Sequence, residues 1–183
     1  MRKLSKFQFW ALTWFSKPAC DRQLYKLAAK LKPKSIVHFG LGNLRQAETL
    51  ITVCQNVSGL EEIRFTGVDL FEARPRKVPG LTLKEAHRTL AATGAKSRVF
   101  PGEATTSLPR LANQLSGTDL LVISLEGSRQ TLDPCWFFIP RMLQANSLVL
   151  VQEQAATGAP YQPLTLAEVE QLSKAIGRPA AAA

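Results

Sequence analysis

The sequence contains few residues of the kinds that bind metal ions or cross-link a chain. Among its 183 residues there are three cysteines and two histidines. The cysteines (Cys20, Cys54 and Cys135) are widely spaced, with no CxxC pair and no pair of histidines nearby. This distribution argues against a metal site and indicates reduced, mostly buried thiols. We therefore expect no bound metal and a cytoplasmic location.

Long hydrophobic segments are also absent. No stretch of the sequence approaches the ~20 apolar residues that cross a bilayer, so we do not expect a transmembrane protein. The apolar run over 7–15 is short, is broken by Gln8 and Thr13, and is not followed by a small-x-small cleavage site. We interpret it as part of an amphipathic helix rather than as a signal peptide.

One face of that helix is apolar, because Leu4, Phe7, Ala11, Trp14 and Phe15 recur at helical spacing. We expect this stripe to pack on the rest of the protein. The alternative is a face that docks on a membrane surface or on a partner.

Acidic residues are scarce near the N-terminus. Residues 1–34 carry nine of the 23 lysines and arginines but only one of the 14 acids, which gives a net charge of +8. The rest of the chain, with 14 bases and 13 acids, is close to neutral. A basic arm of this kind suits a phosphate-bearing partner, such as nucleic acid or an anionic membrane surface, or an acidic protein.

The remaining sequence has the pattern of one α/β domain. Hydrophobic residues make up 45% of the chain and charged residues 20%, which is ordinary for a globular protein. We expect a basic amphipathic helix over 1–20, a single domain over 21–178 and a disordered tail over 179–183. Strands are predicted near 35–39, 63–68, 97–101, 119–124 and 147–152, and helices near 21–31, 44–53, 82–92, 106–114, 134–143 and 165–176. This alternation predicts a Rossmann-like parallel sheet of about five strands with helices on both faces.

The ends of the first two strands are the most informative part of the pattern. The strand over 35–39 runs into Gly40-Leu41-Gly42, and the next strand ends at Asp69. Gly-x-Gly lets the backbone turn tightly and approach a ligand, and the N–H groups of the following helix point at that ligand. A carboxylate at the tip of the neighbouring strand can accept both hydroxyls of a ribose. Together these residues predict a site for a nucleoside-containing cofactor.

Three short motifs lie at predicted strand ends: His38-Phe-Gly-Leu-Gly42, Gly67-Val-Asp-Leu70 and Gly102-Glu-Ala104. With the apolar runs over 119–123 and 147–151, they resemble the Rossmann-like S-adenosylmethionine-dependent methyltransferases over most of the chain. The resemblance implies a methyltransferase that uses S-adenosylmethionine and no metal, with a substrate that the sequence does not identify.

The same resemblance implies a set of cofactor contacts. Asp69 would accept the ribose hydroxyls, and Glu103 would face the adenine amino group. The implied cofactor-binding residues are His38, Gly40, Leu41, Gly42, Asp69, Leu70, Glu103, Ala104 and Ser124. No catalytic side chain is identified, which suits a reaction whose rate comes mainly from positioning.

The sequence departs from the family pattern at several places. His38 replaces the acid of the first motif, Leu44 replaces its third glycine, and Ser124 stands where the family has an acid after the fourth strand. The usual C-terminal antiparallel hairpin is not expected either. The alternative function is therefore a non-catalytic, methyltransferase-like binding or scaffold domain, whose basic arm contacts nucleic acid, an anionic membrane or a protein.

Several candidate residues have a second interpretation. The Gly-x-Gly segment can be simply a tight turn, and Asp69 can cap a loop or pair with Arg74 or Arg45. His38 is either a packed histidine or part of a pocket floor. Glu126 is either a general base or a solvated acid.

Two further groups lie outside these motifs. The first is basic and forms either a solvated face or a surface for an anionic substrate or RNA: Arg74, Arg76, Lys77, Lys84, His87 and Arg88. The second is aromatic and is expected in the core: Trp136, Phe137 and Phe138.

Overall fold

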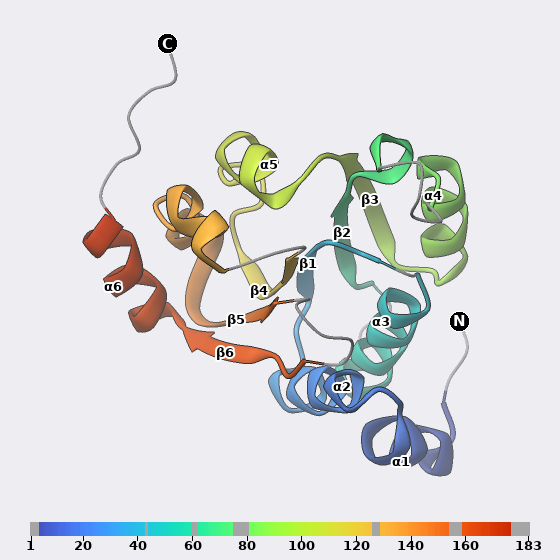
Figure 1. The fold of residues 1–183 in the computed structure, drawn as a ribbon. Helices are drawn as coiled ribbons and strands as arrows, with labels where there is room; N and C mark the ends of the chain where they lie inside the picture. The colour runs from blue at the N-terminus through green and yellow to red at the C-terminus, as the bar shows by residue number, and fades with distance from the viewer. Residues whose placement is uncertain are drawn as a thin grey trace.

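A six-stranded sheet with helices on both faces forms the protein in this computed structural model (Figure 1). The structure describes residues 4–42, 44–59, 62–74, 81–125, 129–153 and 159–176. In chain order the elements are α1 (Lys6–Phe15), α2 (Ala19–Leu31), β1 (Ser35–Phe39), α3 (Leu44–Ser58), β2 (Arg64–Asp69), η1 (Phe71–Ala73), α4 (Leu83–Ala92), β3 (Lys96–Pro101), α5 (Ala104–Leu111), β4 (Thr118–Leu125), η2 (Arg129–Cys135), η3 (Ile139–Met142), β5 (Leu143–Glu153), β6 (Gln162–Thr165) and α6 (Leu166–Ile176).

The sheet order is β3-β2-β1-β4-β5-β6, and all neighbouring strands are parallel except β5 and β6. The predicted class, a Rossmann-like α/β fold, is confirmed. The direction of winding reverses between β1 and β4. In open parallel sheets ligands bind at such a switch point, outside the carboxyl ends of the strands.

The antiparallel edge strand β6 was not predicted, because the sequence indicated about five strands and no C-terminal antiparallel hairpin. Gln162–Thr165 pairs with β5 over four residues, with Pro163 opposite Leu150 and only Leu164 buried. Proline is tolerated there because the strand lies at the sheet edge. A strand this short, with one buried residue, has no alternating pattern that the sequence could reveal.

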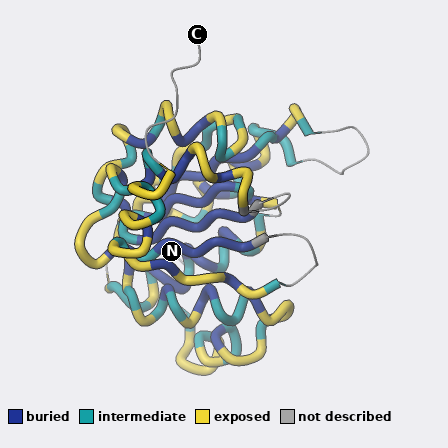
Figure 2. Tube along the Cα trace, turned by 60° about the vertical axis from the view of Figure 1, so that its left-hand side comes forward, coloured by how far each residue is buried: buried dark blue, intermediate teal, exposed yellow. Residues whose placement is uncertain are grey.

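Side chains that alternate along the strands build a separate hydrophobic core on each face. On one face, residues such as Ile36 and Val122 pack with α2, α3 and α4. On the other, Val37 and Ile123 pack with α5, α6 and the 3-10 segments η2 and η3. Figure 2 shows the buried strands running between largely exposed outer segments. Both faces are covered, which explains why the strands are continuous apolar runs.

Two helix starts follow directly from local sequence. Thr82 and Glu85 form a reciprocal capping box at the start of α4. Thr165 and Glu168 do the same for α6, with the Thr165 N–H donating to Glu168 Oε2 at 2.7 Å. Each box satisfies backbone donors that the first helical turn leaves unpaired, so its sequence signature marks the boundary reliably.

The helix predicted over 134–143 is wrong. This stretch instead contains the end of η2, the short η3 and the first residue of β5. Pro134 and Pro140 lack the N–H that an α-helix needs, and a ring in mid-helix also clashes with the preceding turn. The apolar side chains nevertheless serve the core as expected, with Trp136 buried and Phe137 and Phe138 half-buried.

The orientation expected for the first helix is also wrong. On α1 the side chains that pack on the core are Phe9 and Leu12. Three members of the predicted stripe, Phe7, Trp14 and Phe15, are exposed, and its other two members, Leu4 and Ala11, are half-buried. Figure 1 shows α1 outside α2, at the margin of the molecule, so only one side of the helix meets protein. Both sides carry apolar residues, and helical spacing alone does not determine which side the fold covers.

The three cysteines are free and buried, as expected. Burial raises the pKa of Cys54 to about 12 and that of Cys135 to about 11. These thiols stay protonated near neutral pH and are poor nucleophiles.

No helix within the described ranges has the length and apolar character that crossing a membrane requires. The tail predicted over 179–183 lies outside the described residues.

Candidate functional site

A cavity of about 200 Å³ lies at the carboxyl ends of β1, β2, β3 and β4. Seven of the nine predicted cofactor-binding residues line it. The lining residues are Gly40, Gly42, Asp69, Leu70, Arg74, Gly102, Glu103, Ala104, Thr105, Ser124 and Thr131. The parallel sheet therefore brings together segments from four different βα connections.

The two glycines after β1 have different reasons to be glycine. Gly40 has φ +75°, and a Cβ there would overlap the carbonyl oxygen of Ser124 on β4. The fold itself therefore requires glycine at this position. Gly42 has φ +57°, but no described heavy atom lies within 4 Å of where its Cβ would be. Of the two, Gly42 is the one whose open side leaves room for a ligand.

Asp69 connects the loops around the cavity. Its Oδ2 accepts a hydrogen bond from the Gly42 N–H at 3.1 Å, and its Oδ1 accepts one from the Phe71 N–H at 3.2 Å. Its backbone oxygen accepts from the Gly102 N–H at 2.8 Å. One residue at the tip of β2 thus holds the turns that follow both β1 and β3.

The segment after Asp69 is bent back sharply. Phe71 has φ +48°, a left-handed conformation that costs a side-chain-bearing residue about 1–2 kcal/mol. The fully buried Phe71 ring compensates by packing in the core with α3 and α4. This bend turns the Phe71 N–H toward Asp69 and returns the chain so that Arg74 reaches the same carboxylate.

Arg74 occupies the carboxylate of Asp69. Its Nε donates to Oδ1 at 2.9 Å and its Nη2 donates to Oδ2 at 2.6 Å, a bidentate ion pair. The Asp69 side chain is 1% exposed and that of Arg74 is 10% exposed. The predicted alternative, pairing of Asp69 with Arg74, is confirmed. Both oxygens that would accept ribose hydroxyls are therefore engaged within the protein.

Glu103 and Ala104 lie where β3 passes into α5. Glu103 is the N-cap of α5 but makes no side-chain capping bond within the described residues. Its exposed carboxylate accepts a hydrogen bond from the Thr105 hydroxyl at 3.4 Å. Compared with Asp69, this acid is weakly held, so it is available to a polar group in the cavity.

His38 does not line the cavity. It is fully buried on β1, and neither ring nitrogen has a hydrogen-bond partner among the described residues. Burial lowers the pKa of His38 to about 4, because desolvation outweighs the opposing charge of Asp69. The imidazole is therefore neutral near pH 7, and it is packed rather than part of a pocket floor.

Leu41 is the other predicted contact that does not line the cavity. Its side chain is buried over β2, where a Cβ at Gly67 would lie 2.8 Å from Leu41 Cδ1. The glycine at 67 therefore makes space for Leu41, and the pair locks the loop after β1 onto the neighbouring strand.

Sequence reasoning missed four lining residues as cavity contacts: Arg74, Gly102, Thr105 and Thr131. Thr131 comes from η2, which has no sequence signal of its own. Gly102 was within a recognised motif, and its φ of +144° is one that glycine readily adopts.

Other candidates fall elsewhere. Lys84, His87 and Arg88 form an exposed face of α4 and do not line the cavity. Glu126, Arg76 and Lys77 lie outside the described residues. No group of three or more His, Cys, Asp or Glu side chains that could hold a metal occurs in the part of the chain that the structure describes.

Comparisons with known proteins identify the fold. No model of a protein family and no curated protein sequence matches this chain. Solved structures do match, among them the O-methyltransferase TomG from Streptomyces achromogenes, in complex with SAM, at 17% identity and a TM-score of 0.50, covering 74% of this chain and 55% of that one. The O-methyltransferase from Bacillus cereus, in complex with SAH, matches at 15% identity and a TM-score of 0.51, covering 74% and 56%.

These likenesses define the class of fold. The chain has the Rossmann-like fold found in S-adenosylmethionine-dependent methyltransferases, and it spans a little more than half the length of the two structures described. At this level of identity the likeness establishes the fold alone, so activity and ligand must be argued from the cavity.

Proposed function

We propose that this chain is a methyltransferase that binds S-adenosylmethionine in the cavity at the switch point and acts on a substrate still to be identified. The observation that carries the proposal is the convergence of Gly42, Asp69 and Glu103 on one cavity from three successive strand ends. These are the positions where a nucleoside-containing ligand meets a Rossmann-like sheet.

The residues present fit an adenosine-containing cofactor in chemical type. Asp69 would accept the ribose hydroxyls, Glu103 would accept from the adenine amino group, and the open side of Gly42 would allow the backbone to approach the ligand. The cofactor would supply a methyl group on a positively charged sulfur. The chain's own contribution would be to hold that methyl in line with a nucleophile, which needs few catalytic side chains.

Arg74 sets a condition on this binding. A ribose can reach Asp69 only after the bidentate Arg74 pair opens, because each carboxylate oxygen already accepts from both the guanidinium and a backbone N–H. Part of the binding free energy would then be used to separate this pair. We therefore expect affinity lower than a preformed site would give, and a structural change at Arg74 on binding.

Calorimetric titration with S-adenosylmethionine and S-adenosylhomocysteine tests the proposal. We expect micromolar binding by the wild type and about ten- to a hundred-fold weaker binding by Asp69→Asn, which keeps the side-chain shape but loses the charged acceptor. Lys84→Gln, on the exposed face of α4, serves as the matched control and should bind like the wild type. Equal affinities for Asp69→Asn and the wild type would remove Asp69 from the site.

The same ion pair favours one other function, a methyltransferase-like domain that no longer binds the cofactor and serves as a scaffold. In that case the Asp69–Arg74 pair is purely structural. Titration of Arg74→Gln distinguishes the two, since a folded variant with the carboxylate released should bind the cofactor if the site is competent. Absence of binding in both the wild type and this folded variant would favour the scaffold.

A further inference from the structure

The exposed aromatic side chains of α1 form the most conspicuous apolar surface outside the two cores. Phe7 is 73% exposed, Trp10 47%, Trp14 56% and Phe15 63%. Elsewhere in the described ranges, the only comparably exposed large hydrophobic residue is Ile176. A single exposed apolar residue is ordinary on a protein surface, but four large rings on a ten-residue helix are a concentrated patch.

Three of these rings contact one another. Trp10 lies between Phe7, at a ring-centroid distance of 6.2 Å, and Phe15, at 4.9 Å. The Lys26 ammonium from α2 lies 3.7 Å from the centroid of a Trp14 ring. The patch therefore combines a cluster of three rings with a fourth ring, Trp14, that is in contact with a cation.

The helix that presents the patch is firmly held. Phe9 and Leu12 pack against the core on the opposite side, and Thr13 is buried, its hydroxyl donating to the Phe9 carbonyl at 3.0 Å. A capping box between Ser5 and Gln8 begins the helix. The aromatic side chains thus face outward because the other side of α1 is already committed to the fold.

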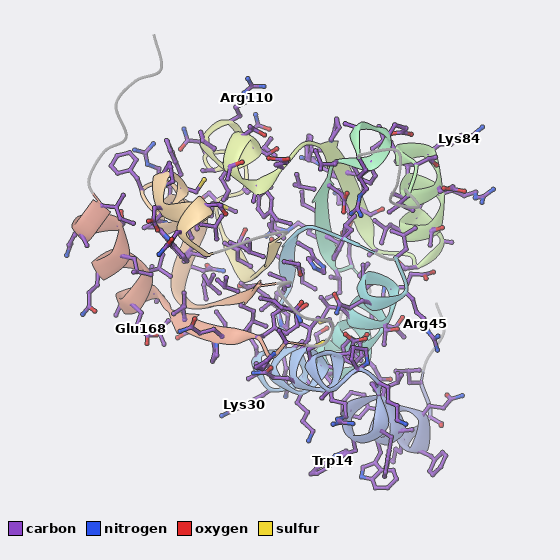
Figure 3. The ribbon with its side chains drawn as sticks, viewed as in Figure 1. Trp14, Lys30, Arg45, Lys84, Arg110 and Glu168 are labelled. Carbon is purple, nitrogen blue, oxygen red and sulfur yellow. The ribbon has the colours of Figure 1, made fainter. Side chains whose placement is uncertain are left out.

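The charge on α1, α2 and the turns that adjoin them is almost entirely positive. Six lysines of α1, α2 and the adjoining turns are exposed: Lys6, Lys17, Lys26, Lys30, Lys32 and Lys34. The only acid in residues 1–34, Asp21, is half-buried and accepts a hydrogen bond from Gln46 Nε2 at 2.6 Å. In Figure 3, Trp14 and Lys30 extend away from the sheet on the same side of the molecule.

We propose that α1 docks on an anionic membrane surface, with Phe7, Trp10, Trp14 and Phe15 entering the interfacial region and the surrounding lysines meeting lipid phosphates. Aromatic rings are favoured at the boundary between headgroups and acyl chains, and lysines add electrostatic attraction to anionic lipid. The helix lies along the surface in this arrangement. The proposal does not depend on the methyltransferase activity.

The geometry favours lipid over the two other possible occupants. Proteins that bind single-stranded nucleic acid present separate ring faces on which successive bases stack. Here Phe7 and Phe15 pack against Trp10, and the Lys26 ammonium lies over a Trp14 ring. A second copy of the chain would bring two lysine-rich surfaces together, and like charges at close range repel. A membrane accepts exposed aromatic side chains and a neighbouring positive charge together.

Vesicle binding and tryptophan fluorescence test the proposal on the full chain. Of the three tryptophans, Trp136 is buried in the core, so a change in emission on adding vesicles reports Trp10 and Trp14. We expect a blue shift and co-sedimentation with vesicles of phosphatidylcholine and phosphatidylglycerol. Binding should weaken as salt is raised, and vesicles of phosphatidylcholine alone should bind much less.

Substitutions separate the two contributions. Phe7→Ser with Trp14→Ser should lower partitioning about a hundred-fold, since each buried ring contributes roughly ten-fold. Lys26→Gln with Lys30→Gln should lower it about twenty-five-fold, since each lysine near an anionic surface contributes about five-fold. Ile176→Ser and Lys174→Gln are the matched controls, because both residues are exposed on α6, which lies on the other side of the molecule from α1 (Figure 1), and these variants should bind like the wild type.

Three results would overturn the proposal. The first is absence of wild-type binding to anionic vesicles. The second is tighter, salt-dependent binding to a short single-stranded RNA than to vesicles. The third is a concentration-dependent dimer that the Phe7→Ser, Trp14→Ser variant abolishes, since a second copy would then cover the patch.

Discussion

The cavity and the outer face of α1 differ in whether the protein itself covers the side chains that could bind a ligand. In the cavity, two charged side chains that could face a ligand are buried and paired with each other, Asp69 with Arg74. On α1, four large aromatic side chains that could be buried are left in solvent. The charges in the cavity are thus already neutralised within the protein, whereas the aromatic side chains of α1 remain in contact with solvent. Ligand binding should be opposed by existing contacts at the first and unopposed at the second.

The largest effect is expected from Asp69→Ala. This change removes the Asp69 carboxylate from its buried ion pair with Arg74 and removes the acceptor of the Gly42 and Phe71 N–H groups. Breaking one side of a buried pair costs about 3–5 kcal/mol of unfolding free energy, measurable by urea denaturation. The matched control is Glu62→Ala, whose pair with Lys96 is 3.5 Å long and exposed, and which should cost less than about 1 kcal/mol. Similar losses of unfolding free energy in both variants would mean that the buried pair stabilises the fold no more than the exposed one.

A second prediction concerns His38 and pH. Its pKa is about 4 in the folded protein because of burial, against about 6.5 in the unfolded chain. Between these values only the unfolded state takes up the proton, so stability should fall by about 3 kcal/mol as pH is lowered from about 6.5 to 4. His38→Leu should remove this part of the pH dependence.

The other histidine provides the control for that experiment. His87 is exposed on α4, so His87→Gln should leave the pH dependence of stability unchanged. If His38→Leu does not fold, an NMR titration of the wild type serves instead, in which the His38 imidazole should remain neutral at pH 5. Protonation of His38 above pH 6 would show that its imidazole is solvated.

The two sides of α1 can be compared with the same substitution. Phe9→Ala removes a ring that packs on the core and should lower the free energy of unfolding by about 2 kcal/mol. Phe7→Ala, two residues away on the exposed side, should change it by less than about 0.5 kcal/mol. Thermal denaturation without vesicles measures both, and equal losses would mean that the aromatic patch supports the fold itself.

The smallest effect is expected from Arg74→Gln, which tests whether Arg74 competes with a ligand in the cavity. If Arg74 competes with the ribose for Asp69, Arg74→Gln should tighten binding of S-adenosylhomocysteine by up to about ten-fold, equivalent to 1.4 kcal/mol. The same variant should be less stable than the wild type, because Asp69 loses its buried counter-charge. Calorimetry with a parallel melting curve measures both quantities. Affinity that falls together with stability would indicate that Arg74 supports the ligand site rather than blocking it.

Features that depend on near neighbours in the sequence were predictable. The strand over 35–39, the capping boxes at Thr82 and Thr165, and the Gly-x-Gly turn are all set within a few residues. The convergence of Asp69 and Glu103 on one cavity was also predictable, because parallel strands place their carboxyl ends at the same edge. Edge strand β6 and the 3-10 segments were not, since their short lengths leave no periodic signal.

Where a residue had two possible partners, or a helix had two apolar sides, the tertiary structure decided between them. Sequence left Asp69 with either a ligand or an arginine as partner, and the bend at Phe71 determined that Arg74 reaches it. Likewise, α1 has apolar residues on both sides, and packing of Phe9 and Leu12 on the core selected the side that stays exposed.

By itself, then, the sequence determined the α/β class, the order of the strands along the chain and the strand ends that meet at the cavity, because hydrophobic period and turn chemistry are local properties. Only the tertiary structure decided which charges neutralise each other and which aromatic surface remains open. Those choices depend on contacts between surfaces that are distant in sequence, where burial of apolar area and pairing of buried charges both stabilise the fold.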